Sequence, residues 1–435
     1  MIKDNLLEKI RSRTAVMGVV GLGYVGLPLA VEFAQGGLTV IGIDVDERKI
    51  TAIGRGESYI ADVASPALAA LVQSGKFRAS CDYAVLRECD AVSICVPTPL
   101  NKTRDPDMSY VIEAANQVAA NCHAGLAIVL ESTTYPGTTE EILQPRLEAA
   151  GFTIGQDVFL AFSPERIDPG NARYGVRNTP KVLGGATPAC TEVATALYQV
   201  AVDTIVPVSN MRAAEMVKLL ENTFRAVNIG LVNEMALMCA RLNVDVWEVL
   251  DAAASKPYGY MAFSPGPGIG GHCIPIDPLY LSWKLKSLNY TARFIELADS
   301  VNSRMPEHVV SLVADALNDD GRALNGANVL ILGVAYKPDT NDVRESPALD
   351  VIATLLEHKA RVSYHDPFVA RVAMDGINLE SQPMTAETLR AADCVVITAS
   401  HTTLDWALVP DHARVVVDTR NALKGRSGPA RIVRL

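Results

Sequence analysis

The feature that constrains the fold of this chain most is a glycine-rich turn near its beginning, Gly21-Leu-Gly23-Tyr-Val-Gly26. An apolar run at residues 15–20 precedes the turn, and a helical pattern follows it from Pro28. In such a strand–turn–helix unit, the first glycine makes a tight turn, the second lets the backbone approach a pyrophosphate, and the third allows helix–strand packing. The pattern therefore predicts a dinucleotide-binding α/β domain whose helix N-terminus faces the anion.

An acidic residue strengthens this prediction. Asp44 stands eighteen positions after Gly26 and follows the next apolar run at residues 39–43. A carboxylate there can bind the hydroxyls of the adenosine ribose and repels a 2′-phosphate, so we expect NAD rather than NADP. A glycine-rich turn of another α/β protein is the alternative, but turn, strand, helix and acid all agree. In this part of the chain we expect cofactor contacts from Gly21, Gly23, Tyr24, Val25, Gly26, Asp44 and Lys49.

The chain alternates β-rich runs with helical patterns in two separate parts, which is typical of parallel sheets with crossover helices. In the first part, further strands are predicted at 91–96, 127–131, 159–162 and 204–208. Long helical stretches at 211–243 and from 290 to about 317 follow, with a Gly/Pro-rich loop at 264–278 between them. Strands at 328–333, 361–365, 394–398 and 415–418 and a helix at 346–358 form the second part. We predict an α/β protein with two Rossmann-like doubly wound domains, 1–208 and 319–435, joined by a central helical domain, 209–318.

Loops that follow strands are where an open α/β sheet places its ligands. Pro97 and Thr98 follow one predicted strand, and Ser132 and Thr133 follow the next. We expect these four residues at the cofactor, although an ordinary turn fits their spacing equally well.

Composition limits the remaining functions. The 435 residues are 49% hydrophobic and 20% charged, which is globular, and the net charge of −10 argues against general affinity for nucleic acid or anionic membrane. The eight cysteines are widely spaced and form no metal-ligand cluster, so we expect a reduced compartment and no metal. No segment reads as a membrane span, and we expect a soluble cytoplasmic protein.

Two stretches offer chemistry. Lys218 and Asn222 are four apart on the predicted long helix and therefore share a face, where they could handle the proton and oxygen of an alcohol. From spacing alone a solvated helix face is the better interpretation. The loop Gly266-Pro-Gly-Ile-Gly270-Gly-His272-Cys273-Ile-Pro-Ile-Asp277 exposes a cysteine among glycines. A thiolate there could add to an aldehyde and form a thioester after oxidation. A buried structural cysteine and a structural His272 are the alternatives.

Taken together, these motifs resemble the UDP-glucose/GDP-mannose (nucleotide-sugar 6-) dehydrogenase family. The resemblance covers nearly the whole chain and includes two later stretches, Tyr336-Lys337-Pro-Asp-Thr-Asn-Asp-Val-Arg344-Glu-Ser346 and Asp418-Thr-Arg420-Asn421. It implies two successive NAD-dependent oxidations at one carbon of a UDP-sugar and a homodimer formed through the helical middle.

The resemblance also implies residue roles. Cys273 matches the covalent nucleophile, and Lys218, Asn222 and Asp277 match groups that handle the alkoxide, a proton or a water; Glu165 and Thr133 match residues near the same water. Arg344 matches a position that reaches the cofactor phosphates. Substrate contacts are expected from Glu165, Arg166, Lys218, Asn222, Tyr258, Gly270, Lys337 and Arg420.

The chain departs from the UDP-glucose version of the pattern. It has Ser163-Pro-Glu165-Arg166 in place of Asn-Pro-Glu-Phe, and Pro169 stands where a second glutamate is usual. These changes are similar to enzymes that act on UDP-N-acetylhexosamines for surface polysaccharides, and residues 179–185 and 253–260 look closest to the UDP-N-acetylglucosamine branch. The mannosamine and galactosamine epimers stay open as alternatives. A 6-phosphogluconate-type dehydrogenase or a non-catalytic NAD-binding protein would not need the cysteine loop together with a second α/β domain.

Overall fold

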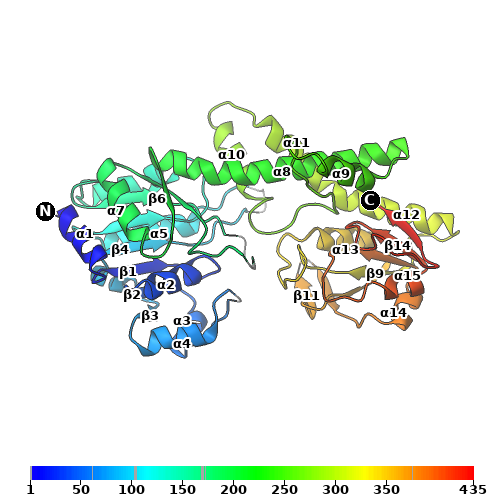
Figure 1. Cartoon of the computed structure of the whole chain (residues 1–435), viewed down its shortest axis with the longest axis horizontal. Coiled ribbons are helices and arrows are strands. Elements are labelled where there is room, and N and C mark those ends of the chain that lie inside the picture. Colours follow the sequence, from blue (N-terminus) through cyan, green and yellow to red (C-terminus); the bar gives the residue numbers. More distant parts are fainter. Residues whose placement is uncertain (1, 61, 102–104, 168–170, 172, 375) are drawn as a thin grey trace. The chain divides into compact units, whose positions relative to one another are not determined.

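The computed structural model describes residues 2–60, 62–101, 105–167, 171, 173–374 and 376–435. The chain forms two compact units. Unit 1 is Met1–Glu221 with Leu279–Tyr290, and unit 2 is Asn222–Pro278 with Thr291–Leu435. The long helix α8 (Met211–Leu242) and the shorter α10 (Asp277–Lys286) each contribute residues to both units. Figure 1 labels these elements along the chain.

Unit 1 is built on one sheet with the strand order β3-β2-β1-β4-β5-β6-β7-β8. The strands are β1 (Val16–Val20), β2 (Thr39–Ile43), β3 (Phe77–Ser80), β4 (Ala91–Ile94), β5 (Ala127–Leu130), β6 (Phe159–Phe162), β7 (Lys181–Gly185) and β8 (Ile205–Val208). The first six run parallel, whereas β7 is antiparallel to β6 and β8 is parallel to β7. The expectation of a wholly parallel sheet is therefore wrong at this edge. The described residues between β6 and β7 form no helix, and a parallel return would require a crossover connection.

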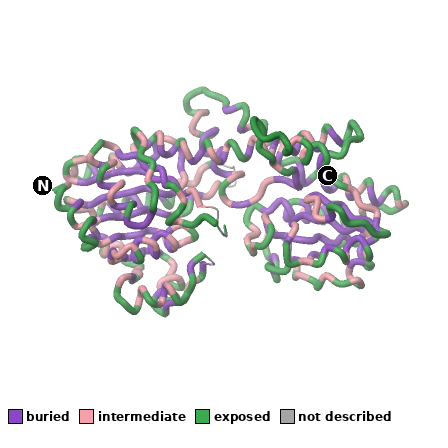
Figure 2. Tube along the Cα trace, viewed as in Figure 1, coloured by how far each residue is buried: buried purple, intermediate pink, exposed green. Residues whose placement is uncertain are grey.

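Helices cover both faces of this sheet, because successive strand residues point to opposite sides. In β2, Val40 packs into one hydrophobic core and its neighbour Ile41 into the other. Figure 2 shows the buried strands inside a shell of more exposed helices. The helices are α1 (Ile2–Arg11), α2 (Gly26–Gln35), α3 (Glu47–Gly54), α4 (Ser65–Gln73), α5 (Ser109–Ala120), α6 (Gln144–Ala149) and α7 (Pro188–Tyr198), with short turns η1 (Tyr83–Glu88) and η2 (Thr139–Leu143).

Unit 2 contains a second, wholly parallel sheet with the order β10-β9-β13-β14-β15. Its strands are β9 (Asn328–Leu332), β10 (Arg361–His365), β13 (Cys394–Ile397), β14 (Val415–Asp418) and β15 (Arg431–Arg434), and β11 (Arg371–Met374) pairs with β12 (Ile377–Glu380) in a separate hairpin. Its helices are α9 (Val246–Ala254), α11 (Arg293–Ser303), α12 (Met305–Asp319), α13 (Pro347–Glu357), α14 (Ala386–Ala391) and α15 (Leu408–His412). The predicted pair of doubly wound α/β sheets with a helical middle is confirmed.

Three helix predictions need correction. The run expected from 290 to 317 is two helices that break at Arg304, because Pro306 has no N–H to continue the hydrogen bonds of α11 and is tolerated only in the first turn of α12. Asp277 and Pro278, expected in the irregular loop, begin α10, where proline is tolerated in the first turn. Helix α2 begins at Gly26 rather than at Pro28. No described helix has the length and apolar character needed to cross a membrane.

Candidate active site

The glycine-rich turn connects β1 to α2, and its three positions require glycine for different reasons. Gly21 has a φ of +90°, and a Cβ there would lie 2.6 Å from the carbonyl oxygen of Cys95. A Cβ on Gly26 would lie 1.8 Å from the carbonyl oxygen of Gly21, so packing requires glycine at both positions. A Cβ on Gly23 meets no described atom within 4 Å. Packing does not require glycine at Gly23, whereas a ligand pressed against the backbone does.

Asp44 is buried directly after β2 and is fixed against this turn. Its Oδ2 accepts hydrogen bonds from the Leu22 N–H and from Lys49 Nζ, each at 2.8 Å, and its Oδ1 accepts one from the Asp46 N–H at 3.0 Å. On the other side of the turn, the Tyr59 hydroxyl donates to the carbonyl oxygen of Leu22 at 2.7 Å. The acid predicted at the ribose is thus rigidly placed beside the predicted pyrophosphate site.

The other predicted cofactor residues of unit 1 follow neighbouring parallel strands at the same sheet edge. Thr98 is buried after β4, and Pro97 before it is exposed. After β5, Ser132 is buried and its hydroxyl donates to the carbonyl oxygen of Val96 at 2.8 Å, while Thr133 is partly buried. Tyr24 is exposed and Val25 is partly buried just before α2. Unit 1 therefore gathers these residues where an open α/β sheet binds ligands.

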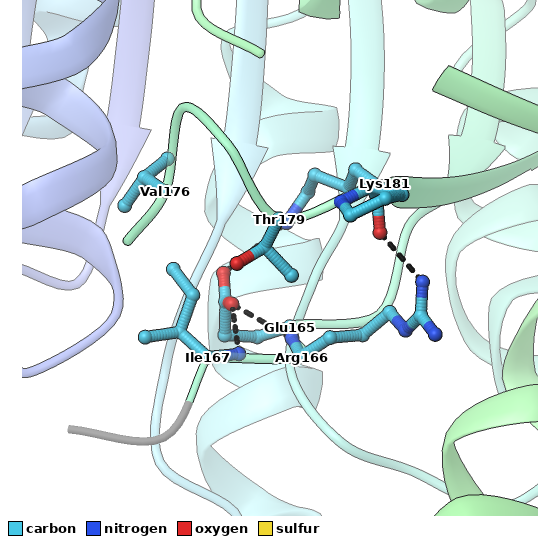
Figure 3. Close-up of a pocket in the computed structure, with 7 residues that line it drawn as sticks. Glu165, Arg166, Ile167, Val176, Thr179 and Lys181 are labelled. Atoms are coloured by element: carbon cyan, nitrogen blue, oxygen red, sulfur yellow. Dashed lines mark hydrogen bonds and ion pairs between the residues drawn. The ribbon is translucent and has the colours of Figure 1, made fainter. Parts of the chain in front are cut away.

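Glu165 lies just beyond the end of β6 and is buried. Its Oε1 accepts the backbone N–H groups of Arg166 and Ile167 at 2.7 and 2.8 Å, contacts that Figure 3 shows. The predicted substrate residue Arg166 turns its guanidinium to protein acceptors, the carboxylate of Glu221 at 2.5 Å and the carbonyl of Pro180 at 2.5 Å. Pro169 lies outside the described residues.

Sequence reasoning missed the buried partners of Glu165. Lys181 Nζ, at the start of β7, lies 3.2 Å from Glu165 Oε2 and 2.7 Å from Glu131 Oε2. Both residues were visible in the sequence only as the ends of apolar runs. A Lys that begins an apolar strand and a Glu that directly follows one are themselves a signal, because such residues are rarely fully buried unless paired.

Helix α8 carries Lys218 and Asn222 one turn apart, and both are buried rather than solvated. Asn222 Nδ2 donates to Asp277 Oδ2 at 2.5 Å, and Asp277 is itself 3% exposed at the start of α10. The interpretation of this helix face as a solvated surface is therefore wrong. Within unit 2, the structure brings Asn222 and Asp277 together, although they stand far apart in the sequence.

Cys273 is exposed in a turn immediately before α10, whereas five of the other cysteines are buried. Its carbonyl oxygen accepts the backbone N–H groups of Ile276 at 3.1 Å and Asp277 at 2.8 Å, which fixes the turn. The thiol predicted as a nucleophile is thus held on ordered backbone at the surface of unit 2. A buried structural role, the alternative for this cysteine, does not fit its exposure.

The glycines of the cysteine loop allow close backbone approach within unit 2. A Cβ on Gly266 would lie 2.4 Å from Nη1 of Arg420, the arginine predicted at the substrate. A Cβ on Gly270 would lie 2.7 Å from the carbonyl oxygen of Glu345 and from Cβ of Tyr336. The loop therefore packs directly on the segments that carry Arg420 and Lys337. Burial lowers the pKa of Arg420 to about 10, and its Nε donates to the Thr398 carbonyl at 2.9 Å.

Two predicted residues of unit 2 are less enclosed. Arg344 Nη2 pairs with Asp342 Oδ2 at 2.7 Å, with the arginine side chain about half exposed. Burial favours a raised pKa for Asp342, but the hydrogen bonds and charge of Arg344 outweigh it and lower that pKa. Tyr258 is 73% exposed, in a loop after α9, with Lys256 Nζ 5.2 Å from the centre of its ring.

Comparison with known protein families identifies the family to which this chain belongs. Three models of one family match the chain in order. The NAD-binding domain of the UDP-glucose/GDP-mannose dehydrogenase family matches residues 15–202, its central domain 212–304, and its UDP-binding domain 330–425. The chain belongs to the UDP-glucose/GDP-mannose dehydrogenase family. It is a UDP-sugar dehydrogenase that uses NAD, as the glycine turn, Asp44 and the resemblance predicted.

Individual relatives agree with this assignment. The chain is 35% identical over 422 residues to the UDP-N-acetyl-D-mannosamine dehydrogenase of Salmonella typhi, covering 93% of this chain and 98% of that one. It is 34% identical over 388 residues to the UDP-N-acetyl-D-glucosamine 6-dehydrogenase of Pseudomonas aeruginosa, covering 88% and 90%. Among solved structures, a UDP-D-ManNAc dehydrogenase from Pyrococcus horikoshii superimposes with a TM-score of 0.88 at 31% identity, covering 96% of this chain and 98% of that chain.

The residues of unit 1 fit NAD. Gly23 has no side chain between its backbone and the open space beside the turn. Asp44 presents a carboxylate beside the turn, and Lys49 pairs with that carboxylate. NAD, when bound, accepts a hydride from the alcohol carbon. The protein's part is to hold the alcohol and to handle its proton and oxygen, for which Lys218, Asn222 and Asp277 have the right chemistry.

Proposed function

We propose that this dehydrogenase oxidises the C6 hydroxymethyl group of a UDP-N-acetylhexosamine to a carboxylate, with UDP-N-acetyl-D-glucosamine as substrate and surface polysaccharide as the destination of the product. The observation that carries the proposal is the exposed Cys273, held on a fixed turn ahead of the buried Asp277–Asn222 pair. A dehydrogenase that stopped at an aldehyde or ketone would have no use for this thiol.

The proposed reaction has three stages. In the first, Lys218 and Asn222 stabilise the alkoxide as the hydroxyl proton leaves and a hydride passes to NAD. In the second, the Cys273 thiolate adds to the aldehyde, and a second hydride transfer turns the hemithioacetal into a thioester. In the third, water attacks the thioester, and the Cys273 thiol is released with the carboxylate. The balance is one alcohol, two NAD and one water giving one carboxylate, two NADH and three protons.

The remaining roles follow from residue chemistry. Glu165 and Thr133 orient the attacking water, and Asp277, held by Asn222, accepts its proton. Arg420 and Lys337 bind the anionic substrate from unit 2, and Tyr258, Gly270 and Arg166 line its path. Tyr24, Val25, Pro97, Thr98, Ser132 and Arg344 complete the cofactor contacts. In the proposed division, residues 1–208 bind NAD, residues 209–318 carry the cysteine loop, and residues 319–435 bind the UDP-sugar.

The choice of sugar rests on the chain's similarity to hexosamine dehydrogenases. Relatives named for mannosamine and for glucosamine are equally similar, at 35% and 34% identity. UDP-N-acetylmannosamine and UDP-N-acetylgalactosamine are therefore the alternatives. The motif segments 179–185 and 253–260 favour glucosamine.

A substrate panel tests the proposal. The purified protein is mixed with NAD and, separately, UDP-GlcNAc, UDP-ManNAc, UDP-GalNAc and UDP-glucose, NADH is followed and the product is weighed. The highest kcat/KM is expected for UDP-GlcNAc with a product heavier by the mass change of CH2OH to COOH. A preference of tenfold or more for another of the four, about 1.4 kcal/mol in transition-state binding, would assign that sugar instead.

A further inference from the structure

Lys181 is a buried lysine that contacts Glu165. The carboxyl ends of the parallel strands β5 and β6 place Glu131 and Glu165 at one edge of the sheet. Strand β7 runs antiparallel to β6, pairing Phe162 with Gly184, so its first residue starts at that same edge. Continuing this register sets Lys181 across from Glu165. Sheet topology thus inserts one ammonium group between two carboxylates.

The contacts around Lys181 extend into the interior. Its Nζ donates to Glu131 Oε2 at 2.7 Å and to Glu165 Oε2 at 3.2 Å. The other oxygen of Glu131 accepts the hydroxyl of Tyr198, the last residue of α7. Since Tyr198 donates there, the Ser93 hydroxyl must donate to Tyr198, at 2.6 Å. Glu131, Tyr198 and Ser93 are at most 1% exposed, and Lys181 is 5% exposed.

An arrangement of this kind is more than a surface ion pair. Buried charges carry a desolvation penalty of several kcal/mol each, and removing one partner leaves the others uncompensated. The charge of Lys218 also acts on Glu165, so two lysines balance the two carboxylates.

Glu165 is the carboxylate that this arrangement keeps charged. Burial favours a raised pKa for Glu165, but the charge and hydrogen bond of Lys181, the N–H of Ile167 and, to a smaller extent, the charge of Lys218 outweigh burial and lower that pKa. At Glu131, burial wins, and its pKa is raised despite Lys181. Three donors from the described residues occupy Glu165: the N–H groups of Arg166 and Ile167 on Oε1, and Lys181 on Oε2. A carboxylate has about four acceptor positions, so Oε2 can still accept from one more donor.

We propose that Lys181 is a positioning residue, anchored by Glu131 and Tyr198, that keeps Glu165 ionised and fixed so that Oε2 orients the attacking water without itself taking up the proton. This inference rests on the proposed function, because Glu165 acts on water only in the hydrolysis of the thioester. It adds a residue that touches neither the substrate nor the cofactor in the proposed reaction. It also divides the work between two acids, with Glu165 orienting the water and Asp277 receiving its proton.

The test is the pH dependence of carboxylate release, measured by quenching the reaction at a series of pH values and constant ionic strength. The wild-type rate should fall on the acid side only at low pH. The acid limb of the rate profile is the pH range in which the rate falls toward low pH. In Lys181→Met, this limb should move to higher pH by about one unit or more, since a neighbouring positive charge lowers a carboxyl pKa by about 1–3 units. Lys181→Arg keeps the positive charge, so its acid limb should lie closer to that of the wild-type enzyme.

Glu131→Gln is the matched variant in the opposite direction. It removes a competing negative charge and keeps a hydrogen-bonding side chain, so the acid limb should stay or move down. An acid limb that does not move in a folded Lys181→Met enzyme with normal NAD affinity would overturn the proposal, as would an upward shift in Glu131→Gln. If Lys181→Met does not fold, the direction in which the acid limb moves in Glu131→Gln tests the proposal alone.

Two further controls separate this inference from the proposed function. Wild-type enzyme that makes no carboxylate from any UDP-sugar contradicts the proposed function itself. Wild-type enzyme that makes carboxylate, together with a Glu165→Gln variant that releases it at the full rate, leaves the function standing and removes the role of Lys181.

Discussion

At the scale of single residues, the glycine turn shows how one motif meets two demands. Gly21 and Gly26 are required by the fold, because a Cβ at either would collide with backbone. Gly23 has space around it, and we propose that the bound pyrophosphate is what requires glycine there. The sequence pattern pointed to all three glycines, but it could not distinguish why each position requires glycine. Only the distances to Cys95 and Gly21 do so.

A pair of glycine variants tests this division. Gly23→Ala should weaken NAD binding about tenfold or more while leaving the melting temperature of the free protein nearly unchanged. Gly26→Ala should lower the melting temperature, because overpacking costs about 1–3 kcal/mol or more. Thermal unfolding without NAD and titration with NAD measure the two effects. Equal NAD affinity in Gly23→Ala and wild type would contradict the placement of the pyrophosphate.

Asp44 provides a second test at this scale. Asp44→Ala removes a charged acceptor from the Leu22 N–H and from Lys49, and it removes the expected ribose partner. A hydrogen bond to a charged group contributes about 1.5–3 kcal/mol, so the NAD dissociation constant should rise roughly tenfold or more. Asp46→Asn, which keeps a capping side chain at α3, should leave it near wild type. Calorimetric titration of both variants with NAD measures the two dissociation constants. Comparable losses of NAD affinity in Asp44→Ala and Asp46→Asn would mean that the ribose is bound elsewhere.

At the scale of elements, α8 fixes its own position on unit 1 through Glu215. This buried carboxylate accepts the Gly137 N–H at 2.5 Å and the N–H and hydroxyl of Thr139 at 3.0 and 2.7 Å. Burial raises the pKa of Glu215 to about 7 despite these hydrogen bonds. The helix that carries Lys218 is therefore attached at a group that titrates near neutrality.

This attachment predicts a pH dependence of stability. The pKa of Glu215 is about 7 when folded against 4.5 as its ordinary value, so the folded state binds the proton more tightly. Stability is highest below about pH 4.5 and falls as the pH rises toward 7, by about 3 kcal/mol at 1.36 kcal/mol per pKa unit. In Glu215→Gln this slope should disappear, whatever the absolute stability. Urea midpoints between pH 5 and 7.5 measure it, and an unchanged slope in the variant would exclude Glu215 as its source.

Elements with a strong apolar pattern were predicted better than elements that contain charged residues. Strands β1, β2, β4, β5 and β6 and helix α8 have predicted limits close to the observed ones, whereas β3 (Phe77–Ser80), which contains Arg78, was not predicted. Strand β7 was missed because Lys181 begins it, and a buried charge at a strand end interrupts an apolar pattern. The break at Arg304 was missed although Pro306 marked it. The pairs Lys181–Glu165 and Asn222–Asp277 depend on strand register and helix packing, which the sequence does not display.

At the scale of the whole molecule, the exposed apolar side chains of the helical middle carry the proposed homodimer. In unit 2, α8 and α11 expose Leu231, Leu242, Phe294 and Leu297 by 53 to 75%. Large exposed hydrophobic side chains on neighbouring helical segments are typical of a protein–protein interface. A second copy of the chain is the partner that the family resemblance implies.

Charge substitutions test this interface. The variant Phe294→Glu with Leu297→Glu should shift the enzyme from dimer to monomer in analytical ultracentrifugation, because a buried unpaired carboxylate is strongly unfavourable. Phe368→Glu, at an exposed aromatic outside these helices, should remain a dimer. A monomeric wild-type protein, or a double variant that still dimerises, would contradict the assignment.

We propose that one carbon of the sugar is oxidised twice through Cys273. The most direct measurement is the number of NADH molecules formed per UDP-N-acetylhexosamine consumed, with the product identified by mass, in wild type and in Cys273→Ala. We expect two NADH and one carboxylate for wild type, and no carboxylate with retained NAD binding for Cys273→Ala. One NADH per sugar with an aldehyde or ketone product, or normal carboxylate formation by Cys273→Ala, would contradict this proposal.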